Sequence, residues 1–375
     1  MEFIDTLPEH LRHPEVPYRT HIKRKILSLG ESISALTKVY LDTKFWVDLR
    51  NVALGRSIDA NLRPLLDLLR SLVASGRVIC PISTEIFLEI FRQSDPTTLA
   101  ASVRLIDQLS HGICLLNEHE RIGTETGHFF RTYSGGTDKI YPLKHLVWTK
   151  VAYVFGLVTP NYTNEDLKSQ GLDVALQKVF FDEMWQTDLS DFLVVSNGKL
   201  RMPDMPDISG SLNDGKLSNL QEYTSFHDLF LIELKGVLDI CRPIFADVMR
   251  AIYQGDTGKT PTDQEIAADK SGDWIANAIY ECFRLGKVSD ELPILRVGSS
   301  LHAAVRWDVS RKYKRNDCAD FRHATAAVPY YDYFLTERSL SLLLSDGNMK
   351  LRDYFGCVAL PDAEGAFAVL SGLQK

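Results

Sequence analysis

Strand-like and helix-like segments alternate along the first third of this 375-residue chain. A β-prone run at residues 38–41 precedes an amphipathic helical pattern at 45–54, and a second helical pattern at 61–75 precedes a strand-like run at 77–82. A further short strand is expected at 113–116. Alternation of this kind predicts parallel strands joined by helical crossovers, and therefore a doubly wound, mainly parallel α/β sheet.

The alternation stops at about residue 141 and resumes near the carboxyl end, where strands are expected at 333–336 and 357–360. The segment between is mostly helical in pattern, with turn-rich stretches at 196–215 and 255–272. Its most apolar part, residues 145–158, contains Lys150, is too short to span a membrane, and is expected to form a buried helix. The predicted organisation is an N-terminal extension (1–30), an α/β domain in two pieces (31–130 and 306–375) and a helical insertion (131–305).

Charge and cysteine content narrow the classes of function. The chain has 42 basic and 49 acidic residues and a net charge of −7, which excludes a protein that coats polyanions with its whole surface. Any contact with nucleic acid is therefore expected to be local. The six cysteines are far apart and form no Cys-x-x-Cys pair, and residues 1–30 are too charged for a secretory signal. A reduced, cytoplasmic protein is expected.

Acidic residues occur at several expected strand and helix ends. Asp42 directly follows the first strand, Asp317 and Asp320 are three residues apart in the first turn of a helix, and Asp332 and Glu337 flank a strand. Alone, Asp42 is more often a helix cap than a ligand. Several carboxylates at one edge of a parallel sheet, however, repel one another unless cations or shifted pKa values compensate. The grouping favours a metal site.

Four segments along the chain carry acidic residues at the expected strand and helix ends. The first is Lys-Val-Tyr-Leu-Asp-Thr at 38–43, and the second is the helix that carries Glu85 and Glu89. The third is the pattern Asn-Asp-x-x-Asp-x-x-His-Ala at 316–324, and the fourth is Asp-x-Phe-Leu-Thr-Glu at 332–337. Taken in order, these four segments resemble the successive acidic motifs of PIN-domain ribonucleases. The resemblance covers the two pieces of the α/β domain and includes neither the N-terminal extension nor the helical insertion.

The resemblance implies a three-layer α/β/α fold in which carboxylates bind Mg²⁺ or Mn²⁺ and hydrolyse RNA by a two-metal mechanism. The catalytic acids that it implies are Asp42, Glu89, Asp320 and Glu337. The wider set of implied metal ligands is Asp42, Glu85, Glu89, Asp317, Asp320, Asp332 and Glu337. Glu85 and Glu89 are one helical turn apart, so their spacing alone does not choose between them, and we favour Glu89.

This chain departs from the family at two positions. The family often has Asn or Ser where Lys44 stands, and its fourth acid commonly lies one residue further along, where Arg338 stands. The basic run at 311–315 directly precedes the turn that contains Asp317, and it is either a solvated helix end or a phosphate-binding segment. His323 is expected to contact phosphate or to support a neighbouring carboxylate. The candidate substrate-binding residues are Arg311, Lys312, Lys314, Arg315, His323, Thr336 and Lys44.

The hypothesis from the sequence is a metal-dependent endoribonuclease, with the role of a toxin or a phage-defence effector implied by the resemblance. A DNA nuclease that acts on single strands or special structures would use the same acids. A catalytically inert PIN-like module that binds nucleic acid is the alternative without enzymatic activity. The expected partners are RNA, a protein inhibitor or partner subunit, and a second copy of the chain; no membrane partner is expected.

Overall fold

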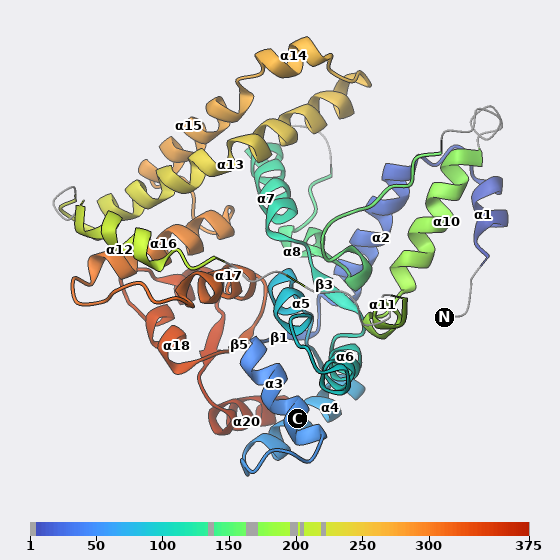
Figure 1. Cartoon of the computed structure of the whole chain (residues 1–375). Coiled ribbons are helices and arrows are strands. Elements are labelled where there is room, and N and C mark those ends of the chain that lie inside the picture. Colours follow the sequence, from blue (N-terminus) through green and yellow to red (C-terminus); the bar gives the residue numbers. More distant parts are fainter. Residues whose placement is uncertain are drawn as a thin grey trace. The chain divides into compact units, whose positions relative to one another are not determined.

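The computed structural model describes residues 5–133, 139–162, 172–195, 202, 206–218 and 223–374 (Figure 1). Over these residues the protein is mixed α/β and contains far more helix than strand. The chain divides into two compact units. Unit 1 is Met1–Asn117 with Lys144–Pro203 and Asp362–Lys375, and unit 2 is Glu118–Leu143 with Asp204–Pro361. These boundaries differ from the predicted ones, because the predicted α/β domain has residues in both units.

Unit 1 contains the N-terminal helices, the first four strands and the C-terminal helix (Figure 1). Its elements are α1 (Leu7–Arg12), α2 (Tyr18–Ser32), β1 (Thr37–Leu41), α3 (Thr43–Ala53), α4 (Leu62–Ala74), β2 (Val78–Ile79), α5 (Thr84–Ile90), α6 (Pro96–Ser110), β3 (Ile113–Leu115), β4 (Trp148–Lys150), the 3₁₀ turn η1 (Val151–Tyr153), α10 (Leu172–Gln186), α11 (Leu189–Val195), α20 (Ala363–Ser371) and the 3₁₀ turn η2 (Gly372–Gln374). The short helix α8 (Leu143–Leu146) spans the boundary between the units.

The strands expected in unit 1 are confirmed. β1 pairs with β2 in parallel, with Thr37 opposite Val78, and the β-branched and aromatic residues that follow in β1 are buried. A parallel bridge between Ile82 and Cys114 then connects the segment after β2 to β3. The helix predicted at 61–75 is confirmed as α4, and α6 begins as expected, with Asp95 accepting a 2.9 Å hydrogen bond from the Thr98 N–H.

The buried helix predicted at 145–158 is wrong. Trp148–Lys150 forms strand β4, which pairs antiparallel with β3, and η1 follows. The Leu116 N–H also donates a 2.9 Å hydrogen bond to the Val147 carbonyl. A short apolar run with β-branched and aromatic residues suits a strand as well as a buried helix. It forms a strand here because it pairs with the backbone of β3.

The N-terminal helices pack on the rest of unit 1. A Cβ atom at Gly30 in α2 would lie 2.2 Å from the backbone oxygen of His145, so this close approach of two backbones requires glycine. At the opposite end of the sequence, α20 packs against α4. Arg77 further donates a 2.9 Å hydrogen bond to the Leu373 carbonyl. Both termini of the chain are therefore part of unit 1.

Unit 2 is mostly helical and contains one parallel strand pair (Figure 1). Its elements are α7 (Glu118–Tyr133), α12 (Ser209–Ser218), α13 (Phe226–Thr257), α14 (Asp263–Ala268), α15 (Ser271–Arg284), α16 (Pro293–Trp307), α17 (Asp317–Ala327), β5 (Tyr333–Leu335), α18 (Arg338–Leu344), α19 (Leu351–Phe355) and β6 (Val358–Leu360). The two strands expected near the carboxyl end are confirmed as β5 and β6, which run parallel with Phe334 opposite Ala359.

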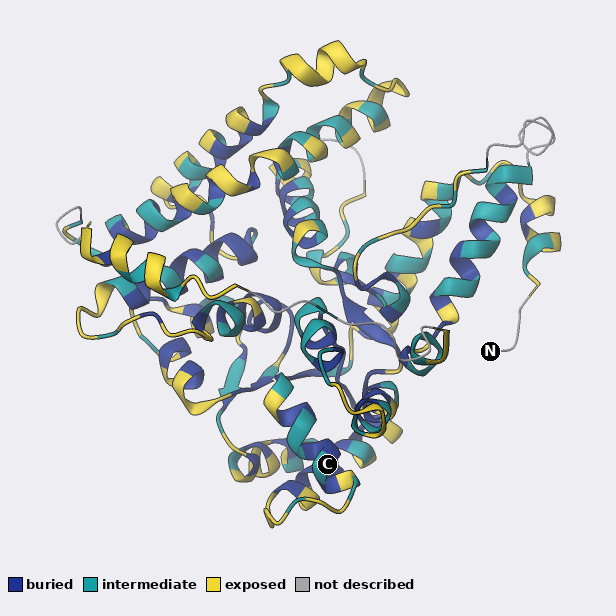
Figure 2. Cartoon of the chain, viewed as in Figure 1, coloured by how far each residue is buried: buried dark blue, intermediate teal, exposed yellow. Residues whose placement is uncertain are grey.

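The long helix α13 organises the helical core of unit 2. It begins with a capping box between Ser225 and Asp228, and it packs against α7, α15 and α16 around a cluster that includes Leu234 and Ile279. α13 ends at Gly258, which has a φ of +68°. Apart from the helix predicted at 145–158, the insertion is helical as expected, and exposed α14 interrupts the turn-rich stretch 255–272 (Figure 2).

The other predicted turn-rich stretch, 196–215, lies partly outside the described residues, which leave out 196–201 and 203–205. Its last part is helical, because α12 begins at Ser209. No helix in the described part of the chain is both long enough and apolar enough to cross a membrane.

Candidate functional site

Asp42 lies where β1 ends and α3 begins. Its backbone is extended, with φ −65° and ψ 163°, and its carboxylate Oδ1 accepts a 2.7 Å hydrogen bond from the Lys44 N–H. The residue is 7% exposed. The buried β-prone run before it and the amphipathic run after it explain this placement, since a strand that turns directly into a helix needs an N-cap. The helix cap that the sequence suggested is therefore present.

The neighbouring strand end carries a second acid. Ser83 is the N-cap residue of α5, and its Oγ shares a 2.8 Å hydrogen bond with the Tyr40 hydroxyl of β1. Since β1 and β2 are parallel, the segments that follow them leave the same edge of unit 1. Glu85 is in the first turn of α5 and Glu89 is one turn further from the strand end. This position favours Glu85 as the partner of Asp42, whereas the sequence favoured Glu89.

Asp48 is an acid in the second turn of α3 that sequence reasoning missed. It is half-buried on α3, and its pKa is raised first by burial, with further increases from the charges of Asp59 and Asp42 and an opposing effect from Lys44. Residues six apart do not lie on the same face of a helix, so the helical period did not indicate an interaction between Asp42 and Asp48. The carboxylates of Asp42 and Asp48 nevertheless interact electrostatically.

In unit 2, Asp317 and Asp320 lie in the first turn of α17, as expected. Asp317 is 5% exposed; its Oδ2 accepts a 2.9 Å hydrogen bond from the Lys314 N–H, and its Oδ1 is 3.6 Å from the Arg311 guanidinium. Asn316 occupies the N-cap position but makes no capping hydrogen bond through its side chain. Asp317 therefore holds the turn that leads into α17, and Asp320 beside it is half-buried.

Asp332 and Glu337 lie at opposite ends of β5. Asp332 precedes the strand, and its carbonyl accepts a 3.0 Å hydrogen bond from the Val358 N–H of β6. Glu337 follows the strand and is the N-cap residue of α18, although its side chain makes no capping hydrogen bond. Glu337 thus has the same position in unit 2 that Asp42 has in unit 1. Asp332 and Glu337 thus flank the strand, as expected, and only Glu337 lies at its carboxyl end.

The basic run before α17 is partly exposed, and hydrogen bonds from α12 hold its backbone. Lys312, Lys314 and Arg315 are exposed, whereas Arg311 pairs with Asp317. Helix α12 holds this loop. Lys216 Nζ donates hydrogen bonds of 2.7, 2.6 and 2.6 Å to the carbonyls of Val305, Asp308 and Arg311; Asn213 Nδ2 donates to the Tyr313 carbonyl at 2.9 Å, and Asn213 Oδ1 accepts from the Tyr313 N–H at 2.8 Å.

The remaining predicted substrate-binding residues have different surroundings. Lys44 is exposed and close to Asp42, which suits contact with a phosphate. His323 and Thr336 are buried, and the Thr336 N–H donates a 3.1 Å hydrogen bond to the Leu360 carbonyl. Burial favours the supporting role for His323 that the sequence left open, and gives Thr336 a place in the packing of the two strands.

Comparison with known proteins yields no relative for this chain. No protein-family model matches it, and no curated protein or solved structure matches it with statistical significance. Function is therefore inferred from the residues and their placement.

Proposed function

We propose that the chain is a metal-dependent endoribonuclease of PIN-like, three-layer α/β/α architecture that hydrolyses RNA phosphodiester bonds with Mg²⁺ or Mn²⁺. One observation carries the proposal: acids follow the parallel strands of unit 1, with Asp42 after β1 and Glu85 in the helix after β2. Glu337 follows β5 of unit 2 in the same way. Functional groups of open parallel sheets gather beyond the carboxyl ends of the strands.

The donor set fits the ions named. Mg²⁺ and Mn²⁺ prefer oxygen ligands, and Asp42 and Glu85 offer only carboxylates. When bound there, such an ion activates a water molecule and offsets the charge that develops on the phosphate. The chain supplies the carboxylates, an extended backbone that positions Asp42, and the exposed ammonium of Lys44 for substrate phosphate. The resemblance adds Asp320 and Glu337 of unit 2 as ligands to be tested separately.

The proposal is tested by cleavage of end-labelled single-stranded RNA, and of DNA of the same sequence, by the purified full chain. Mn²⁺ or Mg²⁺ should support cutting of RNA, and EDTA should abolish it. Preferential cutting of the DNA would instead support the single-strand DNA nuclease. Binding of both polymers without cutting, by folded protein with saturating Mn²⁺, would overturn the proposal in favour of the inert binding module.

Within α5, Glu85→Gln is expected to reduce RNA cleavage more than Glu89→Gln does. Glu85 is in the turn next to the strand end, and Glu89 lies about 6 Å further along the helix axis at 1.5 Å per residue. Initial rates at saturating Mn²⁺ compare the two matched variants directly. The reverse order would assign the ligand role to Glu89, as the sequence favoured, and would contradict the placement argued from the strand end.

The exposed basic run is expected to set the salt dependence of RNA binding. Each Lys or Arg that neutralises a phosphate of a single strand contributes about 0.7 to the slope of log affinity against log salt. Replacing Lys312, Lys314 and Arg315 together by Gln should therefore lower the slope by about 2. Fluorescence anisotropy in EDTA, which prevents cleavage, measures the slope.

The control for this experiment is the pair Lys23→Gln and Arg24→Gln, which removes exposed cations of α2 in unit 1. For this double variant, the slope of log RNA affinity against log salt should equal that of the unmodified protein. An unchanged slope in the triple variant would show that the basic run before α17 is a solvated surface without a role in RNA binding.

A further inference from the structure

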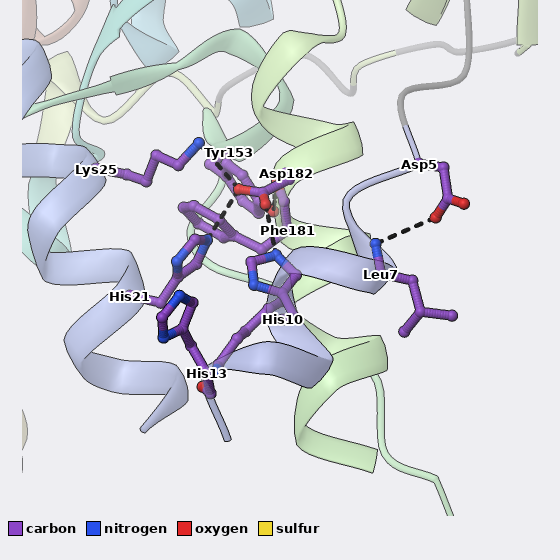
Figure 3. A network of polar contacts seen from close by, with 10 residues as sticks. Asp5, Leu7, His10, His13, His21, Lys25, Tyr153, Phe181 and Asp182 are labelled. Carbon is purple, nitrogen blue, oxygen red and sulfur yellow. Dashed lines mark hydrogen bonds and ion pairs between the residues drawn. The ribbon is translucent and has the colours of Figure 1, made fainter. Parts of the chain in front are cut away.

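Two helices of unit 1, α1 and α2, direct side chains at one carboxylate, Asp182 of α10 (Figure 3). His10 of α1 places its Nε2 2.8 Å from Asp182 Oδ2, and His21 of α2 places its Nε2 2.9 Å from Asp182 Oδ1. One ligand atom from each of these residues lies within 4.8 Å of the others. Among the described residues, this is the one group of three His, Cys, Asp or Glu side chains with that geometry.

The surroundings of the cluster hold its rings in place. Asp182 and His10 are buried, and the His21 side chain is 14% exposed. The His10 and His21 rings meet edge to face at 4.9 Å, and His21 meets Phe181 in the same way at 5.7 Å. Phe181 in turn stacks on Tyr153 within an apolar cluster. Imidazoles fixed by packing on an apolar wall form a preorganised ligand set.

The Asp182 carboxylate has a third partner besides the two imidazoles, the ammonium group of Lys25. Lys25 Nζ is 3.1 Å from Asp182 Oδ1, and the Lys25 side chain is 39% exposed. Lys25 therefore approaches from the solvent side and has room to withdraw when another cation takes its place.

We infer that His10, His21 and Asp182 form a binding site for one divalent transition-metal ion of the zinc class. Two imidazoles and a carboxylate suit Zn²⁺, Co²⁺ or Ni²⁺, whereas Mg²⁺ prefers oxygen ligands. Three protein ligands leave a fourth tetrahedral position for water. Bonds of about 2.0–2.1 Å place tetrahedral ligand atoms about 3.3 Å apart. The two imidazole nitrogens lie 2.8 Å from Asp182 Oδ2 and 2.9 Å from Asp182 Oδ1, and one ligand atom from each residue lies within 4.8 Å of the others, so small side-chain shifts suffice.

The bound ion would fasten the two N-terminal helices to α10. His10 and His21 lie on α1 and α2, and both helices already pack against α10. Binding of an ion to the folded state alone stabilises that state by mass action. This site is separate from the carboxylates of the proposed nuclease and does not depend on nuclease activity.

The experiment titrates Co²⁺ into the EDTA-treated and dialysed full chain and follows visible absorption. Tetrahedral Co²⁺ with nitrogen ligands absorbs far more strongly than six-coordinate Co²⁺ with oxygen ligands, so the band separates this site from the proposed nuclease carboxylates. We expect one equivalent of tetrahedral Co²⁺, displaced by Zn²⁺. His21→Gln and Asp182→Asn should each weaken binding by at least about a hundredfold.

Three further variants make the outcome specific. His13→Gln is the matched control, since His13 lies on the same N-terminal segment but is exposed and contacts Glu15. It should bind as the unmodified chain does. Lys25→Met should bind Co²⁺ more tightly, because Lys25 competes for Asp182. Asp42→Asn should keep the band, so failure of the nuclease proposal leaves this result unaffected.

Two results would overturn the inference. The first is the absence of a tetrahedral band in the unmodified chain at excess Co²⁺, which would leave a hydrogen-bonded cluster closed by Lys25. The second is a band that persists in both His21→Gln and Asp182→Asn. If either variant unfolds by circular dichroism, His10→Gln replaces it. The melting temperature gives an independent readout: Zn²⁺ should raise it for the unmodified chain and for His13→Gln, but not for a folded ligand variant.

Discussion

Asp42→Asn is expected to lower the rate of Mn²⁺-dependent RNA cleavage by at least about a hundredfold while leaving the protein folded. Asp42 follows β1 and caps α3 by accepting a hydrogen bond from the Lys44 N–H. Asparagine caps helices about as well as aspartate, so its side-chain oxygen can keep that hydrogen bond. The substitution therefore removes the negative charge that a divalent ion requires and leaves the local structure in place.

Asp95→Asn is the matched control for this prediction. Asp95 caps α6 of the same unit through the Thr98 N–H, is exposed, and is not one of the acids of the proposed site. Single-turnover cleavage at saturating Mn²⁺ should be near normal for Asp95→Asn and nearly absent for Asp42→Asn, with similar thermal unfolding of both. Full activity of folded Asp42→Asn would remove Asp42 from the catalytic set and, with it, the observation that carries the nuclease proposal.

The unmodified protein is expected to lose stability relative to Glu125→Gln as the pH rises from 5 to 7.5. Glu125 is fully buried on α7; the Tyr330 hydroxyl donates to its Oε1, and the Ile294 N–H donates to its Oε2 at 3.1 Å. Burial raises the pKa of Glu125 to about 8, although these two hydrogen bonds and the charge of Arg121 oppose the increase.

The direction of this effect follows from proton binding. In the unfolded chain Glu125 ionises near its ordinary value of 4.5, whereas in the folded protein it keeps its proton up to about pH 8. Between these values the folded state binds more protons, so the free energy of unfolding falls as pH rises. The loss from this residue between pH 5 and 7.5 is about 3 kcal/mol. Gln has no charge to lose, and Tyr330 can reorient its hydroxyl to accept from the amide.

Urea unfolding at pH 5 and at pH 7.5 measures the effect as a difference between the two proteins. Between pH 5 and pH 7.5 the unmodified protein should lose more unfolding free energy than Glu125→Gln does. Glu281→Gln, an exposed change on α15 of the same unit, should show no shift of that size. A constant difference for Glu125→Gln would mean that Glu125 is ionised in the folded protein throughout this range, with its charge balanced by Arg121.

Several elements of the fold followed from local pattern. In three segments, all neighbouring residues favour the same conformation. These are the buried run before Asp42, the amphipathic pattern of α4 and the Asp-Pro start of α6. The strand β4 did not follow, because an apolar run of its length packs equally well as helix or strand. Its pairing with β3, from a segment more than thirty residues earlier, decided the outcome.

The same distinction applies to the sites. Asp42 is found from the sequence because its role depends on the strand before it and the helix after it. Nothing in the sequence connects Asp182 with His10 and His21, which precede it by 172 and 161 residues. A cluster of histidines at short spacing is recognisable in a sequence, but ligands brought together from three helices are not.

Residues near one another in the chain therefore determined where strands and helices begin and end, and which acids stand at those ends. Tertiary packing decided the partner of β3, the burial of Glu125 and the convergence of imidazoles on Asp182. The physical reason is that backbone propensity and capping act over a few residues, whereas burial, desolvation and charge pairing depend on segments that meet only when the chain has folded.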